Sequence, residues 1–447
     1  MPVNRSIIKC EVCESLTMVR TQIGYLEEIP IRIPCENCNI LIEGELLVNS
    51  KDGTWKINFN NAEMQNPQKI EDKEIDYYLE TSGELLTRKL IKNNGLDFNN
   101  MNFSPFLKNI DRMGHDKIIE FMKRFSSFIN DIENIWPKIK RINQLWINES
   151  YDYIEKELKK LLPEIEFPMK NKLDFLRGIH KANIFFLWQG INTEKYEKKY
   201  KETFDNVDKL ISDKPKKIGE LAIYFGDEGL LELYEEKVLL QIDKFLNKFI
   251  YLAPVFGLQY YDEITQNDIR NKGITTTSFN DIKDLYIDSY EIIFEVYNLV
   301  MAFNNLEHRN DFNKMPEKRS DVTELSEFKN QSKGIKLKYL TEEDEEKFDS
   351  LLKPYLDNKI RNAIGHNSYK YDAIEEIIYY DPSRNEFSKE NAKEIYLLDF
   401  AIKCYKTFEN FVNILELIYQ TRMIYFMTEG LSPSIEFDKY MEELNNL

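Results

Sequence analysis

Apolar residues recur at helical spacing through the last quarter of the chain. One set falls every four residues, on a single face of a helix, and comprises Leu352, Leu356, Ile360 and Ile364. A second set, within residues 391–427, alternates at three and four residues, as along the seam of a helix bundle. Its members are Leu398, Ala401, Tyr405, Phe408, Val412 and Leu415. The pattern predicts an amphipathic helix that ends near residue 365, followed by a long closing helix.

A third helix is predicted to begin at residue 278. Ser278 is a favourable N-cap residue, and Asp281 would lie in the first turn, where an acidic side chain is stabilising. His308 and Arg309 follow at the polar end of the same pattern. Cationic side chains stabilise a helix at its C-terminus. We therefore expect a helix over about 278–309 and a structural role for His308.

The segments between these helices carry turn signals. Residues 310–338 are polar and contain Pro316 and Gly334, which predicts an inserted loop. Thr341 is the expected cap of the next helix, and Pro354 is expected to interrupt it. Residues 377–381 are rich in β-favouring side chains and end in Asp-Pro, so we expect a hairpin after His366.

The region from about residue 70 to 275 is predicted to be helical. Trp136, Trp146 and Trp188 are expected in its core, because they accompany Phe and Leu residues at helical spacing. His115 and His180 are expected to be structural histidines. We find no pattern of catalytic residues in this region.

Four of the five cysteines form two Cys-x2-Cys pairs, Cys10 with Cys13 and Cys35 with Cys38. Each pair can supply two thiolates from a tight loop, and two such loops can converge tetrahedrally on Zn²⁺. Four sulfur ligands leave no position for a reactive water, so we expect a structural zinc. β-favouring stretches between and after the pairs predict a β-rich, zinc-ribbon-like module.

Length and composition indicate several globular domains. The chain has 447 residues, which is too long for one ordinary hydrophobic core. Its hydrophobic fraction of 42% is typical of globular proteins. The patterns predict a mainly α protein with a β-rich module at 1–62, a helical middle region at 63–275 and a helical domain at 276–447. The longest apolar run is too short to span a bilayer, and the N-terminus lacks an apolar signal core. We therefore expect a cytoplasmic protein with no membrane partner.

The formal net charge of −17 argues against indiscriminate attraction to nucleic acid, because phosphate contacts need Lys and Arg. Residues 138–141, 195–201 and 214–217 are candidates for a local basic groove, although a solvated helix face or loop explains each more simply. The sequence contains no GxxxxGK[ST], GxSxG or HExxH motif. Predictions of ATP hydrolysis, serine-esterase or zinc-protease activity therefore have no residues to support them.

The most specific chemistry lies in Arg361-Asn362-Ala363-Ile364-Gly365-His366, at the end of the predicted amphipathic helix. Asn362 and His366 share a helix face, and Gly365 is expected to end the helix, with His366 in the following turn. RNA cleavage by the 2′-hydroxyl needs a base, an acid and positive charge at the phosphorane. An imidazole can serve as base or acid, and the Arg361 guanidinium can supply the charge. One such set is sparse for an active site, so we expect two copies to face each other in a homodimer.

This segment resembles the R-x4-6-H signature of the HEPN family in its Arg-Asn-x3-His form. The order of helix, motif, hairpin and closing helix over residues 278–430 is also similar. The resemblance implies a dimerising HEPN-like helical bundle and metal-independent cleavage of RNA, such as tRNA or mRNA, as in many abortive-infection, toxin–antitoxin and CRISPR proteins. It implies that Arg361 and His366 are catalytic and that Asn362 orients His366. In one toxin branch an antitoxin modifies a tyrosine two positions after the histidine, whereas Tyr369 lies three positions after it.

Three hypotheses remain open at this point. The first is an anti-phage endoribonuclease that responds to a phage-derived trigger. The second is a non-catalytic module that binds a nucleotide, nucleic acid or protein, with Arg361 and His366 gripping a phosphate. The third is a toxin restrained by a separate antitoxin. RNA cleavage in EDTA separates the first hypothesis from the second, and growth inhibition without phage favours the third.

Overall fold

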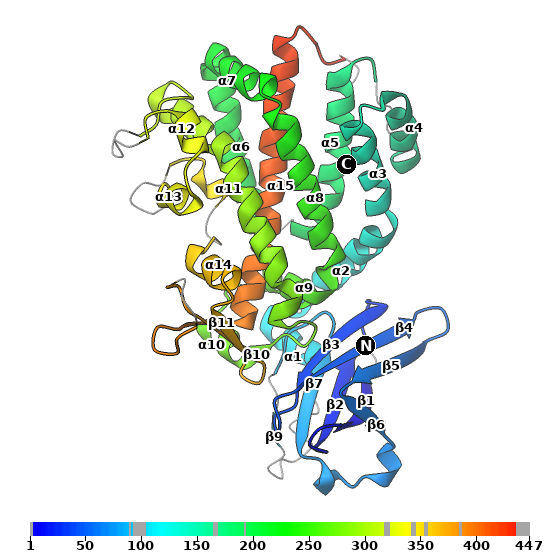
Figure 1. Ribbon diagram of the computed structural model, residues 1–447. Helices are drawn as coiled ribbons and strands as arrows, with labels where there is room; N and C mark the ends of the chain where they lie inside the picture. The colour runs from blue at the N-terminus through cyan, green and yellow to red at the C-terminus, as the bar shows by residue number, and fades with distance from the viewer. Residues whose placement is uncertain are drawn as a thin grey trace. The chain divides into compact units, whose positions relative to one another are not determined.

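The structure, a computed structural model, is mainly helical with a small β region at the N-terminus (Figure 1). It divides into two compact units, each assembled from three chain segments. Unit 1 comprises Met1–Ile129, Phe245–Ile287 and Lys359–Lys406, and unit 2 comprises Asn130–Lys244, Asp288–Asn358 and Thr407–Leu447. Unit 1 thus draws on all three of the consecutive domains predicted from the sequence. The structure describes residues 3–88, 91–92, 104–163, 169–191, 194–316, 322–340, 346–352, 356–383 and 387–434.

Two sheets form the N-terminal part of unit 1, with the strand orders β6-β1-β2-β7-β9 and β3-β4-β5 (Figure 1). β7 lies parallel to β2, with Tyr77 opposite Thr17, and all of its residues are buried. The β region therefore continues past the predicted limit at residue 62, because β7 pairs with a strand far earlier in the chain. The bounds are β1 Val3–Cys10, β2 Leu16–Gln22, β3 Glu28–Pro34, β4 Leu41–Asn49, β5 Thr54–Asn60, β6 Ala62–Gln65, η1 Pro67–Lys69, η2 Asp72–Glu74, β7 Tyr77–Ser82, β8 Thr87–Arg88 and β9 Ile91–Lys92.

Aromatic side chains form the centre of the helical part of unit 1. The ring of Phe125 in α2 lies 5.6 Å from that of Phe256 in α9, and Phe128 lies 5.2 Å from Phe249, measured between centroids. All four side chains are buried, so these helices pack through a continuous apolar contact. The bounds are α1 Pro105–Met113, α2 His115–Asn134, α9 Phe249–Phe256, η4 Gly257–Tyr260, α10 Gln266–Asn271 and β10 Lys272–Gly273, which pairs with β8.

Two long helices, α11 (Phe279–Arg309) and α15 (Leu397–Thr428), contribute to both units. The predicted start of α11 is confirmed, because the N–H and hydroxyl of Ser278 donate to Asp281 Oδ2 at 2.7 and 2.8 Å. α15 begins at Leu397 and not near residue 391, because the residues just before it form the strand β13. Among the helices of the described ranges, none combines the length and apolar character needed to cross a membrane.

Unit 2 consists of packed helices with buried polar contacts. Trp136 and Trp146 are buried as predicted, whereas Trp188 is half-buried. His180 is a structural histidine, with Nε2 lying 2.7 Å from a Glu416 carboxylate oxygen. The same prediction for His115 in unit 1 is wrong, because that side chain is 76% exposed. The bounds are α3 Trp136–Ile147, α4 Tyr151–Leu161, α5 Lys172–Ile191, α6 Glu194–Asp213, α7 Pro215–Asp227, α8 Leu230–Asn247, α12 Leu325–Lys329, α13 Lys333–Lys338 and η6 Asp349–Leu351.

The connection between α11 and the motif differs from the prediction. The stretch predicted as a loop over 310–338 contains the short helices α12 and α13. α14 spans only Asn358–Gly365, so Leu352 and Leu356 precede it. Leu352 is buried directly after the turn η6, and the regular apolar spacing therefore came from separate elements. The predicted cap Thr341 and the predicted interruption at Pro354 lie outside the described residues.

The predicted hairpin after His366 is confirmed. β11 (Tyr369–Asp372) and β12 (Ile377–Tyr380) are antiparallel, and β13 (Lys393–Tyr396) adds a third strand beside β12. The ring of Tyr369 packs edge-on against Phe279 of α11 with centroids 5.0 Å apart. This contact turns one face of the small sheet toward the core of unit 1.

Candidate functional sites

The two Cys-x2-Cys pairs occupy turns with the same backbone pattern. In each turn the carbonyl of the first cysteine, Cys10 or Cys35, accepts from the N–H four residues later, which belongs to Glu14 or Asn39. Glu14 and Asn39 both have positive φ, 63° and 62°. The left-handed residue ends each turn directly after the second cysteine of the pair. One turn follows β1 and the other follows β3.

The four thiols converge within unit 1. Their Sγ atoms all lie within 4.8 Å of one another, with Cys13 and Cys35 at 3.4 Å and Cys10 and Cys38 at 3.7 Å. Tetrahedral coordination with metal–sulfur bonds of about 2.3 Å requires sulfur separations of about 3.8 Å. The four cysteines therefore lie close enough to hold a metal ion, as the spacing predicts.

The thiols of this cluster alter one another's pKa values. Burial opposes ionisation of Cys13, but hydrogen bonds from the hydroxyl and N–H of Ser15 lower its pKa to about 6. The backbone N–H of Ile40 lowers the pKa of Cys38, yet hydrogen bonds with the other cysteines raise it to about 12. Crowded thiolates repel one another, and a divalent cation at their centre would remove this repulsion.

The motif helix α14 ends in a Schellman turn. The N–H of Ser368 donates to the Ala363 carbonyl at 2.8 Å, and the N–H of Asn367 donates to the Ile364 carbonyl at 3.1 Å. Asn367 has a φ of 55°, so it is the left-handed residue that stops the helix. Gly365 is the last helical residue and not the terminator that the sequence predicts. His366 nevertheless lies where predicted, exposed in the turn just past the helix.

Arg361 and Asn362 lie in the same helix and contact each other. Arg361 Nη1 donates to Asn362 Oδ1 at 3.3 Å, and the Asn362 side chain is buried. The backbone carbonyl of Asn362 accepts from the His366 N–H at 2.9 Å. The guanidinium lies close to Gly365, because a Cβ built there would be 3.7 Å from Arg361 Nη1, an ordinary contact distance. The guanidinium thus lies beside the turn that carries His366.

Tyr369, three residues after the histidine, is engaged within unit 1. Its hydroxyl accepts a hydrogen bond from Lys283 Nζ at 2.8 Å, and the ammonium lies 5.4 Å from the ring centroid. This contact fixes the first strand after the motif to α11. Sequence reasoning did not identify Lys283, because nothing in the local pattern pairs residues so far apart in the chain.

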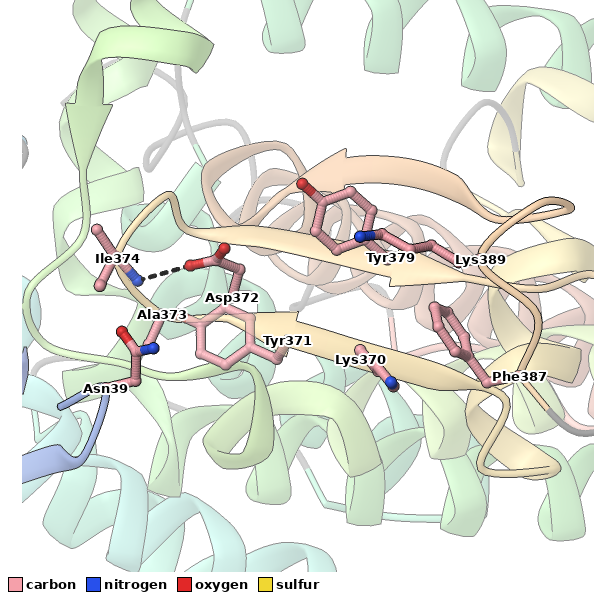
Figure 2. Close-up of a pocket in the computed structure, with 9 residues that line it drawn as sticks. All are labelled: Asn39, Lys370, Tyr371, Asp372, Ala373, Ile374, Tyr379, Phe387 and Lys389. Atoms are coloured by element: carbon pink, nitrogen blue, oxygen red, sulfur yellow. Dashed lines mark hydrogen bonds between the residues drawn. The ribbon is translucent and has the colours of Figure 1, made fainter. Parts of the chain in front are cut away.

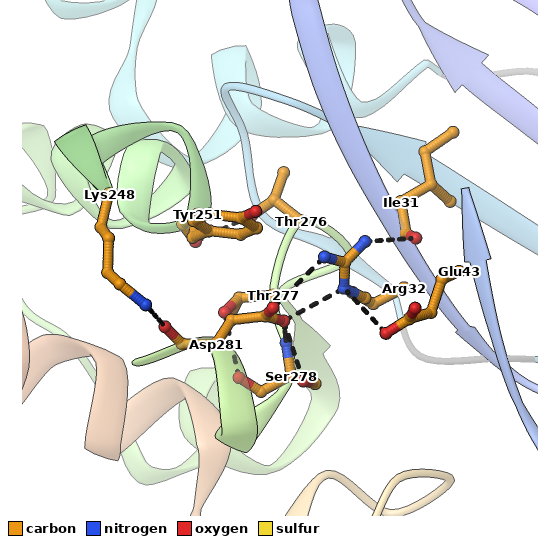
Figure 3. A network of polar contacts seen from close by, with 9 residues as sticks. All are labelled: Ile31, Arg32, Glu43, Lys248, Tyr251, Thr276, Thr277, Ser278 and Asp281. Carbon is orange, nitrogen blue, oxygen red and sulfur yellow. Dashed lines mark hydrogen bonds and ion pairs between the residues drawn. The ribbon is translucent and has the colours of Figure 1, made fainter. Parts of the chain in front are cut away.

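Arg32 makes a second long-range contact that the sequence did not reveal (Figure 3). Its guanidinium donates to both carboxylate oxygens of Asp281, at 3.1 and 3.2 Å, and its backbone N–H donates to the Thr275 carbonyl at 2.8 Å. The carboxylates of Asp281 and then Glu43 raise the pKa of Arg32 against the opposing effect of burial. The strand that leads into Cys35 is therefore bound to the first turn of α11.

The candidate basic stretches in unit 2 make structural contacts. Lys140 forms an ion pair with Asp243 at 2.6 Å, and Arg141 forms one with Glu157 at 2.8 Å. Lys214 donates to backbone carbonyls near the end of α11. These side chains already have protein partners, which fits the simpler interpretation of the stretches 138–141 and 214–217.

No family model, curated protein or solved structure matches this chain.

Proposed function

We propose that the chain is a metal-independent endoribonuclease of the HEPN type that acts in anti-phage defence by abortive infection. The supporting observation is the end of α14, where the Arg361 guanidinium and the exposed His366 flank one Schellman turn. A fixed cation and a titratable imidazole are two of the three groups that cleavage by the 2′-hydroxyl requires, and a second acid–base group is the third.

The residues have distinct proposed roles. Arg361 stabilises the negative charge that develops on the phosphorane, and His366 transfers a proton to or from a ribose oxygen. Asn362 positions the Arg361 guanidinium through its side-chain carbonyl. This differs from the role that the resemblance implies, in which Asn362 orients the histidine.

Two copies would complete the site. A concerted displacement needs a base at the 2′-hydroxyl and an acid at the leaving 5′-oxygen, and one imidazole does not serve both at once. A homodimer that brings two copies of Arg361 and His366 together supplies both groups. We place the protein in the cytoplasm, where RNA is the substrate and a phage-derived trigger activates cleavage.

The metal belongs to the scaffold in this proposal. Cys10, Cys13, Cys35 and Cys38 would hold one Zn²⁺, whose four thiolate ligands leave no position for a water nucleophile. The ion would fix the strands β1 and β3, and β3 carries Arg32, which binds Asp281 in α11. Catalysis itself needs no metal.

Analysis of the RNA ends tests this function. Purified protein incubated with total RNA in EDTA should leave 2′,3′-cyclic phosphate and 5′-hydroxyl ends, because the 2′-oxygen is the nucleophile. RNA that stays intact at high protein excess would overturn the proposal, as would 5′-phosphate ends made only with added Mg²⁺. Growth arrest on expression without phage would assign the same activity to a toxin.

A further inference from the structure

A cavity of about 360 Å³ opens at the hairpin that follows the motif (Figure 2). Its walls come from β11, the β11–β12 turn, β12, the segment after β12 and the second cysteine turn. Small-ligand sites in proteins begin at about this size. The lining residues are Asn39, Lys370, Tyr371, Asp372, Ala373, Ile374, Tyr379, Phe387 and Lys389.

Strand alternation explains why cationic and aromatic side chains meet here. Lys370 lies directly opposite Tyr379 in the β11–β12 ladder, so both project from one face of the sheet. Tyr369, Ile378 and Ile395 belong to the other face, where the two isoleucines are buried. On the outer face Ile377 is buried, whereas Lys370 is exposed and Tyr379 is half-buried, so the part of this face at Lys370 and Tyr379 is open to solvent.

Two ammonium groups border the cavity. Lys370 Nζ lies 5.1 Å from the ring centroid of Phe387, which holds it over an aromatic face, and Lys389 is exposed. The one carboxylate in the lining is already engaged, since Asp372 Oδ1 accepts from the N–H groups of Ile374 and Glu375, both at 3.1 Å.

Tyr379 offers a neutral ring beside these cations. Burial, and then the carboxylates of Asp372 and Glu394, raise its pKa, so the side chain stays a phenol. Glu394 lies opposite Tyr379 on β13 and repels anions at that edge of the sheet. An anion is therefore favoured at the lysines and an uncharged group at the Tyr379 ring.

We infer that this cavity binds one nucleotide of single-stranded RNA, with its phosphate at Lys370 and Lys389 and its base against the ring of Tyr379. Aromatic rings beside lysines are the usual platform for unpaired nucleotides. His366 and Lys370 are four residues apart, which an extended chain spans in at most about 14 Å. The inference rests on the proposed nuclease function, because it makes the cavity a subsite for the strand that His366 cleaves.

The binding test uses a fluorescent, single-stranded 2′-O-methyl oligonucleotide, which lacks the free 2′-hydroxyl and is not cleaved. Anisotropy titrations at several salt concentrations compare wild type with a Lys370→Ala/Lys389→Ala double variant and with Tyr379→Ala. The double variant should lower the slope of log affinity against log salt by about 0.7 per lysine. Tyr379→Ala should bind about tenfold more weakly, and Tyr379→Phe should bind as wild type does.

Lys393→Ala is the matched control. Lys393 is an exposed lysine of β13, but by strand alternation it lies on the same face as Ile395, opposite to the face that carries Lys370 and Tyr379. Wild-type affinity and salt slope in the double variant and in Tyr379→Ala would overturn the subsite, as would no binding by wild type. Binding that depends on these residues in a protein without RNA cleavage would support the subsite and reject the nuclease. RNA cleavage by the wild type, together with wild-type binding by the variants, would support the nuclease and reject the subsite.

Discussion

The guanidinium of Arg361 donates a hydrogen bond to the side-chain carbonyl of Asn362, its neighbour in α14, at 3.3 Å. Adjacent helical residues usually point in different directions, so this contact constrains the arginine to one side of the helix end. The Asn362 side chain is only 8% exposed and its position is fixed by packing. The contact therefore holds a cation beside Gly365, the last residue of the helix.

A double-mutant cycle distinguishes the two roles proposed for Asn362. If Asn362 acts through Arg361, Asn362→Ala should slow RNA cleavage in the wild type but add little in an Arg361→Ala background. If it orients His366, its effect should persist when Arg361 is absent. The measured quantity is the cleavage rate at saturating RNA for the four proteins, and independent, additive effects would contradict positioning of the guanidinium.

The end of α14 gives a test of backbone geometry. Asn367→Ala should lower the free energy of unfolding by about 1 kcal/mol, because Ala lacks the short polar side chain through which Asn tolerates the left-handed conformation, while Asn367→Gly should be tolerated. Gly365→Ala should raise stability by about 0.5–1 kcal/mol, because Gly365 is helical and its site has ordinary contact distances. Denaturation of the three variants checks this, and a destabilising Gly365→Ala would make Gly365 the terminator instead.

The cysteine cluster predicts one tightly held metal ion per chain. Cys38→Ser should reduce bound zinc, measured by elemental analysis, and should lower the unfolding temperature, because three thiolates bind the ion less tightly. Cys404→Ser is the matched control, since Cys404 is a buried cysteine outside the cluster. A Cys38→Ser variant that binds no zinc but unfolds at the wild-type temperature would argue against a structural metal.

Local signals in the sequence identified much of the fold and of both candidate sites. The cysteine spacing, the Ser278 cap and the hairpin depend on residues a few positions apart, and all three have the expected geometry. The position of His366 was also correct, although the residue that ends the helix is Asn367. Asn tolerates the left-handed conformation almost as Gly does, so an Asn two residues past a Gly made the stop ambiguous.

Contacts between residues far apart in the chain could not be predicted from the sequence. The parallel pairing of β7 with β2 and the ion pair of Arg32 with Asp281 join residues without a shared local pattern. The closing helix was predicted from residue 391, but residues 393–396 form the strand β13, because pairing with β12 outweighs helix propensity. The cavity beside Lys370 likewise depends on a register that periodicity does not specify.

Glu84 predicts a pH dependence of stability. Burial raises its pKa from the ordinary 4.5 to about 7, although the N–H groups of Tyr25 and Leu26 donate to it and act in the opposite direction. The folded state then holds this proton more tightly than the unfolded chain. Its contribution is fully present below about pH 4.5 and is lost as the pH rises through about 7, a change of about 3 kcal/mol.

Glu84→Gln should remove that contribution. As the pH rises from 4.5 to 8, the free energy of unfolding should fall by about 3 kcal/mol less in the variant than in wild type, measured by urea denaturation. Glu63→Gln, at an exposed position, is the control and should follow the wild type. An equal pH dependence in Glu84→Gln and wild type would show that Glu84 is ionised in the folded protein.

The most direct test of the central claim is the rate of RNA cleavage in EDTA by wild type, His366→Ala and His115→Ala. His115 is an exposed histidine in the same unit and serves as the matched control. We expect His366→Ala to lose at least about a hundredfold in rate and His115→Ala to keep the wild-type rate, because general acid–base catalysis contributes that much. Undiminished cleavage by His366→Ala, or no cleavage by the wild type, would contradict the account.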